Sequence, residues 1–271
     1  MAGIKLGQSD AYPDTYDATL LEPIPRAMSR SLLGGNTQFS GRDYWHAYEV
    51  SWLAPSGVPQ VAIAEFSLAA SSKNIIESKS FKYYLNSFNQ SVFESRNDVV
   101  ARLTEDLSAV AVGELTVALF DVDDSALMPA KLPGRCIDQT PCDIQSYQPL
   151  DGVLRVDSEQ HVKDYQLHSH LLKSNCPVTG QPDWASLWIQ YSGQKLDEAS
   201  LLKYIVGFRQ YQGFHESCVE RIHHDIMQQC KPTELAVYAR YTRRGGLDIN
   251  PYRTTNAALA NTQPFGRSFR Q

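Results

Sequence analysis

A thiol and a carboxylate flank one turn of the sequence. Cys176 and Asp183 lie at the edges of a Pro-Val-Thr-Gly-Gln-Pro turn within the segment SNCPVTGQPD, residues 174–183. A cysteine and an acid held together at a turn could form a nucleophilic site. Taken alone, Cys176 reads as a small buried hydrophobe and Asp183 as an ordinary turn residue. The remaining sequence must decide between these interpretations.

The residues around this turn have the composition of strands. YQLHSHLLK precedes it and WASLWIQY follows it, and Pro and Gly at this density mark a connection between two strands. An equivalent hairpin is predicted earlier in the chain, from about Asp43 to Trp52 and from Val58 to Leu68, across the residues APSG. Two hairpins of one kind suggest a repeated unit.

The sequence contains an internal duplication. The segment that begins at Phe81 aligns without a gap, at a shift of 120, with the segment that begins at Leu201. Further upstream, a shift of 123 places SGVPQ, residues 56–60, on TGQPD, residues 179–183. The same order of matches over both segments favours duplication over chance. Each half reads as strand, turn, strand, two helices and strand.

The predicted elements give the fold class α+β. Residues 95–112 have a helical stripe, and helices are also predicted for LDEASLLKYIVGFRQYQ and ESCVERIHHDIMQQC. GELTVALFDV and ELAVYARYTRR are predicted to return as strands. We therefore predict two tandem modules, residues 16–124 and 159–271, joined by a connector at residues 125–158 that is rich in Pro, Asp and Gly. Each module should be an antiparallel sheet with a pair of helices on one face.

Composition limits the function classes. The 271 residues carry a net charge of -5, which disfavours nucleic acid as a direct partner. No apolar run reaches the 18 or so residues of a membrane span, and the first 17 residues lack the apolar core of a signal peptide. The five cysteines are odd in number and loosely spaced, which favours free thiols in a reducing cytoplasm.

The two halves differ in their chemistry. Under the upstream shift, Cys176 aligns with Leu53 and Asp183 aligns with Gln60, so the first half lacks both reactive groups. The first half instead carries ESKSFK, residues 77–82, which is short, basic and rich in hydroxyl groups. We therefore expect a division of labour between the halves.

Several motifs together resemble one enzyme family. ESKSFK, KSNCPVTGQPDW, FHESCVERI and ARYTRRGGLDINP are similar to motifs of the NADPH-dependent 7-cyano-7-deazaguanine reductases in their long, two-module form. The similarity runs from about Tyr16 to Pro251. It implies a tandem of tunnelling-fold (T-fold) modules, a homodimer, and reduction of the nitrile of 7-cyano-7-deazaguanine (preQ0) to the aminomethyl group of preQ1 with two NADPH, in queuosine biosynthesis.

The resemblance also implies roles for the reactive and substrate-binding residues. Cys176 would add to the nitrile as a thiolate to form a thioimide, and Asp183 would protonate the nitrile nitrogen. His215 and Glu216 would hold the substrate, since a carboxylate can accept the ring N–H and amino donors of a deazaguanine. A second substrate contact would come from the first module, through Ile76, Glu77 and Ser78. For His215 and Glu216 alone, the ordinary interpretation is a helix start.

The cofactor residues also follow from the resemblance. Ser78 and Lys79 match one NADPH contact, and Arg244 and Gly245 match the other. Hydroxyl and amide groups near a helix start suit a phosphate, as does a guanidinium. Each motif alone could be a solvated helix start or a basic strand end. Because the sequence contains no GxGxxG pattern, the cofactor should bind outside a Rossmann domain.

Two other interpretations of function remain open. The chain could be a purine-binding T-fold protein without redox chemistry, or a thiol-dependent nitrile hydrolase, since water can also attack a thioimide. The joint presence of Cys176, Asp183, Glu216 and Lys79 favours the reductase.

Metal binding is not predicted. His168 and His170 lie on one face of a strand, but no third ligand at a sensible spacing is evident. Surface histidines are therefore the preferred interpretation. Cys136 and Cys142 lie in the connector and receive no role.

Overall fold

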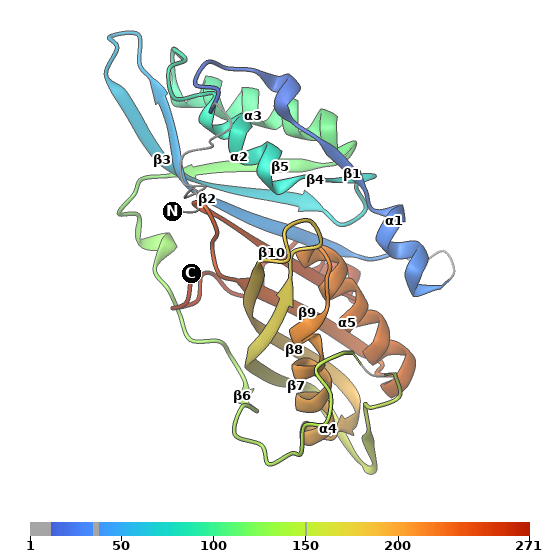
Figure 1. The fold of residues 1–271 in the computed structure, drawn as a ribbon. Helices are drawn as coiled ribbons and strands as arrows, with labels where there is room; N and C mark the ends of the chain where they lie inside the picture. Colours follow the sequence, from blue (N-terminus) through green and yellow to red (C-terminus); the bar gives the residue numbers. More distant parts are fainter. Residues whose placement is uncertain (1–11, 35–37, 150) are drawn as a thin grey trace, which may run out of the picture.

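A single eight-stranded sheet runs through the molecule. The computed structural model describes residues 12–34, 38–149 and 151–271, and the order of its strands in this sheet is β5-β3-β2-β10-β9-β8-β7-β6 (Figure 1). All neighbouring strands are antiparallel except β6 and β7, which are parallel. A separate two-stranded sheet joins β1 to β4. The strands are β1 (Pro23–Pro25), β2 (Gly41–Leu53), β3 (Pro59–Ala69), β4 (Asn74–Ile76), β5 (Leu115–Phe120), β6 (Arg135–Cys136), β7 (Val156–Asn175), β8 (Pro182–Leu196), β9 (Glu234–Tyr241) and β10 (Leu247–Thr254).

A pair of α-helices follows the long strands of each half, and the short helix α1 precedes β2. The α-helices are α1 (Ala27–Arg30), α2 (Ser78–Asn86), α3 (Arg96–Ala111), α4 (Glu198–Val206) and α5 (His215–Cys230). Short 3-10 helices occupy Ala18–Leu20, Ser31–Leu33, Ser125–Leu127, Gly207–Gln210 and Ala257–Leu259. The predicted order of strand, turn, strand, two helices and strand is thus confirmed in each half.

The predicted duplication is visible in a repeated contact. Tyr84 on α2 donates a hydrogen bond to Asp106 on α3, with 2.7 Å between the oxygens. Tyr204 on α4 donates an equivalent bond to Asp225 on α5, also at 2.7 Å. In both halves a buried tyrosine therefore links the two helices of the pair in the same way.

The two helix pairs cover the same face of the sheet. Apolar side chains of α2 and α3 pack on β2 and β3, and those of α4 and α5 pack on β8 and β9, which gives each half its own core. On α3, Val99, Leu103 and Leu107 are fully buried, as the helical stripe predicts. Burial of one such side chain is worth roughly 1.5–3 kcal/mol. The opposite face carries a smaller aromatic cluster of Tyr44, Trp188, Tyr238 and Tyr252.

The strand β10 joins the two halves into one sheet. It pairs with β9 of its own half and, from Leu247 to Arg253, with β2 of the first half. Its buried charges have partners in the first half: Arg253 lies 2.7 Å from Asp43, and Asp248 lies 2.9 Å from His46. The sequence patterns predict a sheet in each module, but they do not predict this strand. The connector before β7 includes β6, and β7 begins at Val156.

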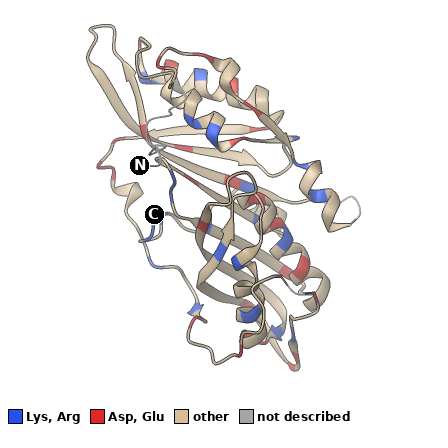
Figure 2. Cartoon of the chain, in the orientation of Figure 1, with Lys and Arg blue, Asp and Glu red and all other residues tan. Residues whose placement is uncertain are grey.

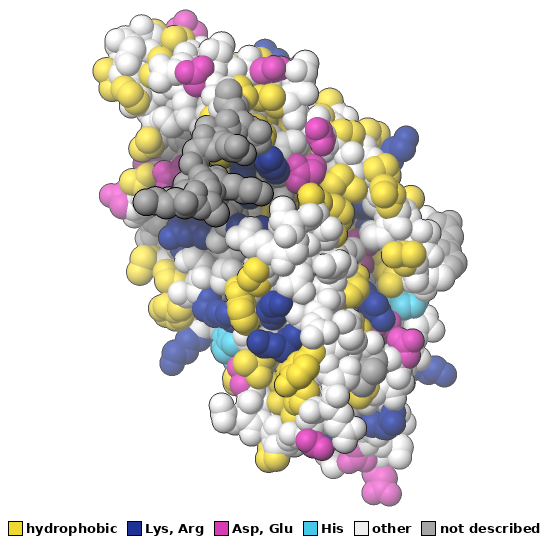
Figure 3. All heavy atoms as spheres, in the orientation of Figure 1, with side chains coloured by type: hydrophobic (Ala, Val, Ile, Leu, Met, Phe, Trp, Pro, Cys, Tyr) yellow, Lys and Arg dark blue, Asp and Glu magenta, His cyan; other side chains and the backbone are white. Residues whose placement is uncertain are grey.

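Charged and apolar side chains are distributed over the whole molecule. Acidic and basic residues are interspersed along both halves (Figure 2), and apolar, charged and other groups alternate on the displayed face (Figure 3). Within the described residues, no helix is long and apolar enough to cross a membrane. Most of the N-terminal segment judged to lack a signal peptide lies outside the described residues.

Candidate active site

Cys176, the predicted nucleophile, lies at the tip of the hairpin formed by β7 and β8. The strand ladder ends with Asn175 opposite Pro182, and Cys176 follows directly. The Cys176 N–H donates to the carbonyl of Gln181 at 2.9 Å, and the Gly180 N–H donates to the carbonyl of Cys176 at 3.0 Å. Gly180 has a φ of 69°, a conformation that glycine adopts without strain. These bonds fix the thiol at one end of a closed turn.

The surroundings of Cys176 favour its thiolate. Partial burial acts to raise the pKa of this thiol, but hydrogen bonds from the hydroxyl and backbone of Thr179, the backbone of Val178 and the side chain of Arg244 outweigh it. The net effect lowers the pKa of Cys176 below its usual value. A lower pKa increases the fraction of nucleophilic thiolate at neutral pH.

Asp183 is buried and forms an ion pair with Arg244. One carboxylate oxygen, Oδ1, lies 2.8 Å from Nε of Arg244 and 3.4 Å from Nε2 of His215. Arg244 is held in turn by Gln181, to which its Nη1 donates at 2.6 Å. The turn that carries Cys176 and the loop that carries Arg244 are thus tied together around Asp183.

His215 has a fixed ring orientation. The imidazole stacks on Tyr241, with 3.6 Å between ring centroids and 6° between ring planes. Nδ1 lies 3.2 Å from the carbonyl oxygen of Ile249, and a carbonyl only accepts, so we assign a proton to Nδ1. Nε2 then faces Asp183.

Glu216 offers an unused acceptor inside the protein. This side chain is at the start of α5 and is buried, and its Oε1 has no hydrogen-bond partner among the described residues. Burial, together with the nearby carboxylate of Asp43, raises the pKa of Glu216 to about 7, although Arg26 and His215 act in the opposite direction. A buried acceptor without a partner costs free energy of folding. Such a group is suited to accept hydrogen bonds from the donors of a ligand.

The first half contributes the start of α2. The Glu77 carboxylate caps this helix by accepting from the backbone N–H groups of Lys79 at 2.9 Å and Ser80 at 2.6 Å. The sequence analysis expected amide groups here to suit a phosphate, but the structure commits these two to the cap. The Ser78 hydroxyl also donates to the Glu77 carboxylate, at 3.5 Å, and the Lys79 ammonium lies 5.5 Å from the ring centroid of Tyr83.

Most of the expected residues meet in one pocket between the two halves of the same chain. Its lining comprises Ile75, Ile76, Glu77, Ser78, Cys176, Pro177, Val178, Asp183, Gly213, Phe214, His215, Glu216, Arg244 and Ile249. Every expected catalytic and substrate-binding residue is in this set. Of the four expected cofactor residues, Ser78 and Arg244 line this pocket, whereas Lys79 and Gly245 do not.

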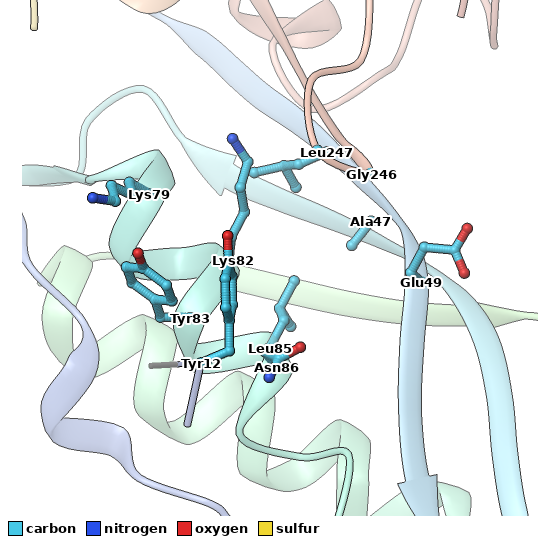
Figure 4. Close-up of a pocket in the computed structure, with 11 residues that line it drawn as sticks. Tyr12, Ala47, Glu49, Lys79, Lys82, Tyr83, Leu85, Asn86, Gly246 and Leu247 are labelled. Carbon is cyan, nitrogen blue, oxygen red and sulfur yellow. The ribbon is translucent and has the colours of Figure 1, made fainter. Parts of the chain in front are cut away.

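Lys79 and Gly245 line a neighbouring groove instead. Its walls are α2, the end of the β9–β10 loop and the strand β2, which contributes Glu49 (Figure 4). The side chain of Lys82 extends from α2 toward the loop at Gly246 and Leu247. Gly245 and Gly246 have φ values of 58° and 75°, so the loop needs glycine at both positions. Since Arg244 and Gly245 are consecutive, the pocket and the groove adjoin.

The structure adds Lys82 and Thr179 to the residues of interest. Burial and the neighbouring Arg244 lower the pKa of Lys82, whereas Glu77, Asp183 and Cys176 raise it. Lys82 therefore lies within electrostatic reach of both the groove and the reactive thiol. The spacing of Lys79 and Lys82 on α2 was a signal in the sequence, because residues three apart share a helix face. Thr179 had no comparable signal.

Comparison with known proteins identifies the family. The sequence profile described as nitrile reductase, 7-cyano-7-deazaguanine-reductase N-term matches residues 12–119, and that of QueF-like protein matches residues 182–259. The chain is 52% identical over 253 residues to a protein of Chromohalobacter salexigens, covering 92% of this chain and 91% of that one. It is 53% identical over 262 residues to a protein of Saccharophagus degradans, covering 95% and 96%. Both relatives are named NADPH-dependent 7-cyano-7-deazaguanine reductase, and the chain belongs to this family.

Proposed function

We propose that this protein reduces the nitrile of 7-cyano-7-deazaguanine to the aminomethyl group of preQ1, with NADPH as the reductant. The observation that carries the proposal is the shared pocket of Cys176, Asp183 and Glu216, in which the pKa of the thiol is lowered and a buried acceptor has no partner. The family to which the chain belongs supports the same activity. Conversion of a nitrile to an amine takes up two hydrides, so each turnover consumes two NADPH.

Substrate recognition is assigned to Glu216, His215 and the start of α2. The ionised carboxylate of Glu216 accepts the ring N–H and exocyclic amino donors of the pyrimidine, and these charge-assisted bonds satisfy its unpartnered oxygen. Ile76, Glu77 and Ser78 bound the pocket from the first half. We accordingly assign the nitrile to the part of the pocket beside the turn that carries Cys176.

The first chemical step is assigned to Cys176 and the groups beside it. The thiolate adds to the nitrile carbon, a C–S bond forms, and the C≡N bond becomes C=N. The nitrogen gains electron density and takes a proton, and we assign the delivery of this proton to Asp183 with His215 beside it, 3.4 Å away. The product is a neutral thioimide on Cys176. The same pair is positioned to deliver further protons to nitrogen in the later steps.

The cofactor residues fit a phosphate-bearing ligand. When bound, NADPH supplies the hydrides that reduce the thioimide carbon. We assign Lys79 and Lys82 to the phosphates of NADPH. Gly245 would allow the protein backbone to come close to the cofactor. Arg244 and Ser78 lie in the adjoining pocket. Two lysines on one helix face and a glycine loop opposite them suit such a ligand without a Rossmann fold.

The setting of the enzyme is also proposed. Five unpaired cysteines, one of them reactive, suit a reducing compartment, and we propose a cytoplasmic location. We further propose a homodimer, as the family resemblance implies, with preQ0 as the small-molecule partner and no direct contact with nucleic acid. We also propose that residues 16–124 and 159–271 form the two modules and that residues 125–158 form the connector between them.

An adduct experiment tests this function. The addition step needs Cys176 and a proton but no cofactor, so protein mixed with preQ0 alone should gain the mass of one preQ0 per chain. Adding NADPH should then release the amine and oxidise two NADPH per nitrile. A nitrile hydrolase would release a product without NADPH loss, and a binding protein would form no adduct.

The variants make the assignment specific. Cys176→Ala should form no adduct while still binding preQ0, and Asp183→Asn should form it slowly. Cys218→Ala is the matched control, because Cys218 is fully buried and its pKa is raised to about 12. Labelling at any other cysteine, or turnover by Cys176→Ala, would show that this pocket is not the reactive centre.

A further inference from the structure

A second cluster of chemically capable side chains lies away from the proposed active site, at the far edge of the sheet. Cys136 on β6 and His168 and His170 on β7 bring one sulfur and two ring nitrogens within 4.8 Å of one another. The sequence predicted no metal site because no third ligand was evident near the two histidines. The fold supplies it from a distant segment, since the parallel pairing of β6 with β7 sets Cys136 opposite His168.

The connector is held firmly at this place. The Gly134 backbone is so close to β7 that a Cβ atom there would lie 2.4 Å from the carbonyl oxygen of Gln166. Ile137 is buried, and its N–H donates to the carbonyl of His168 at 3.0 Å. On the other side of Cys136, the Asp138 carboxylate accepts hydrogen bonds from Ser169 and from the backbone of His170. The cysteine is therefore presented to β7 by a fixed backbone.

Each histidine of the cluster has a hydrogen-bond partner on Nδ1. Nδ1 of His168 lies 3.0 Å from the carbonyl oxygen of Pro133, which assigns its proton to Nδ1 and leaves Nε2 with a lone pair. Nδ1 of His170 lies 2.8 Å from the hydroxyl of Ser186. Ligating histidines usually have such a partner on the second nitrogen.

We propose that Cys136, His168 and His170 bind one zinc ion. One thiolate and two imidazoles suit a borderline-soft ion with tetrahedral preference, and the exposed side of Cys136 leaves the fourth position to water. With bonds of about 2.0–2.3 Å, tetrahedral ligand atoms lie roughly 3.5 Å apart, so the cluster must contract by about 1 Å. Rotation of the exposed cysteine side chain can supply this movement. Binding releases the thiol proton.

The consequence of zinc binding is local to the connector. The ion would tie residues 133–138 to β7 and so stabilise the parallel edge of the sheet. His170 precedes Cys176 by six residues on an extended strand, a separation of roughly 20 Å, so the site is distinct from the proposed reactive thiol. Cys176 can itself bind metal, and the experiment must separate the two sites.

The experiment is a metal titration in a Cys176→Ala background. Chelator-treated protein is titrated with Zn²⁺ against a coloured chelator, and separately with Co²⁺, whose thiolate charge-transfer absorption reports a bound cysteine. We expect one equivalent of either ion, and a rise in the melting temperature with Zn²⁺. Cys136→Ser should abolish the cobalt charge-transfer band and the thermal shift, and His168→Gln should weaken binding at least tenfold.

Two matched controls complete the test. Cys142→Ser changes the other connector cysteine, and His161→Gln changes an exposed histidine of the same strand; both should bind as the parent does. Absence of stoichiometric binding by the parent, or equal binding by the parent and by Cys136→Ser and His168→Gln, would overturn the proposal. Melting curves without metal identify any variant that fails to fold, in which case the cobalt spectrum of His170→Gln decides.

Discussion

Arg244 pairs with Asp183, and the distance from its Nε to the carboxylate Oδ1 is 2.8 Å. The same guanidinium also contributes a hydrogen bond that lowers the pKa of Cys176. The family resemblance alone placed Arg244 with the cofactor, but in the structure Arg244 contacts Asp183 and also favours the thiolate of Cys176. A ligand phosphate near Arg244 would compete for this cation, which would weaken its hold on Asp183. Cofactor binding and proton donation are therefore expected to be coupled.

The first prediction concerns the thiolate of Cys176. Thr179→Val removes the hydroxyl hydrogen bond that contributes most to lowering the pKa of this thiol. The pKa of the Cys176 thiol should rise, and the pH profile of its rate of alkylation by iodoacetamide should shift to higher pH. The rate at neutral pH should fall, whereas the rate well above the pKa should be unchanged. Thr262→Val, at an exposed threonine, is the control, and a wild-type pH profile for Thr179→Val would exclude this cause.

The second prediction concerns the pH dependence of substrate binding. Burial and the carboxylate of Asp43 raise the pKa of Glu216 to about 7 in the free protein. Because the donors of preQ0 need the ionised form, affinity should be full well above pH 7 and should fall up to tenfold per pH unit below it. Calorimetry with Cys176→Ala measures this without adduct formation. Glu216→Gln should bind more weakly, and it should lose this pH dependence.

The same pKa shift predicts an effect on stability. A carboxyl group whose pKa rises from 4.5 to about 7 on folding binds its proton more tightly in the folded state, so its contribution destabilises the fold as pH rises through this range. At pH 8 the cost is at most about 3.5 kcal/mol, since the pKa rises by about 2.5 units and one unit corresponds to about 1.4 kcal/mol. Glu216→Gln should therefore unfold at a higher denaturant concentration than the wild type at pH 8, and the gain should shrink toward pH 5. A destabilised variant at pH 8 would mean that the ionised carboxylate has a partner in solution.

The helices and hairpins were predictable because their signals are local. The stripe of Val99, Leu103 and Leu107 predicted α3 to within one residue at each end, where Ser95 caps its start and Val112 its end. The reactive turn at Cys176 was predictable for the same reason, since Pro and Gly mark the tip between two apolar strands. Family motifs then brought together residues from both halves that no local pattern connects.

The strand β10 was not predictable in this way. In a half-buried strand, the polar residues should face solvent. In β10, however, every residue from Leu247 to Thr254 is buried, including the polar residues Asp248, Asn250 and Arg253. Pro251 within the run also argues against a central strand. These residues are tolerated because partners in distant segments satisfy them, as Asp43 and Glu220 do for Arg253. Such pairing depends on the assembled fold, as does the meeting of Cys136 with His168.

The last prediction concerns the cofactor groove and distinguishes the effects of its two lysines, Lys79 and Lys82. Lys79 and Lys82 share one face of α2, but Lys79 is exposed, whereas Lys82 is partly buried beside Arg244 and Gly245. Lys79→Ala should raise the KM for NADPH tenfold to a hundredfold, since a charge-assisted phosphate contact is worth ~1.5–3 kcal/mol, and it should leave the rate of adduct formation with preQ0 unchanged. Lys82→Ala should raise the KM similarly and should also slow adduct formation, because Lys82 lies within electrostatic reach of Cys176. Lys73→Ala, at an exposed lysine outside the groove, is the control. Steady-state kinetics and intact-mass time courses measure the two effects separately, and an unchanged KM in both variants would remove α2 from the cofactor site.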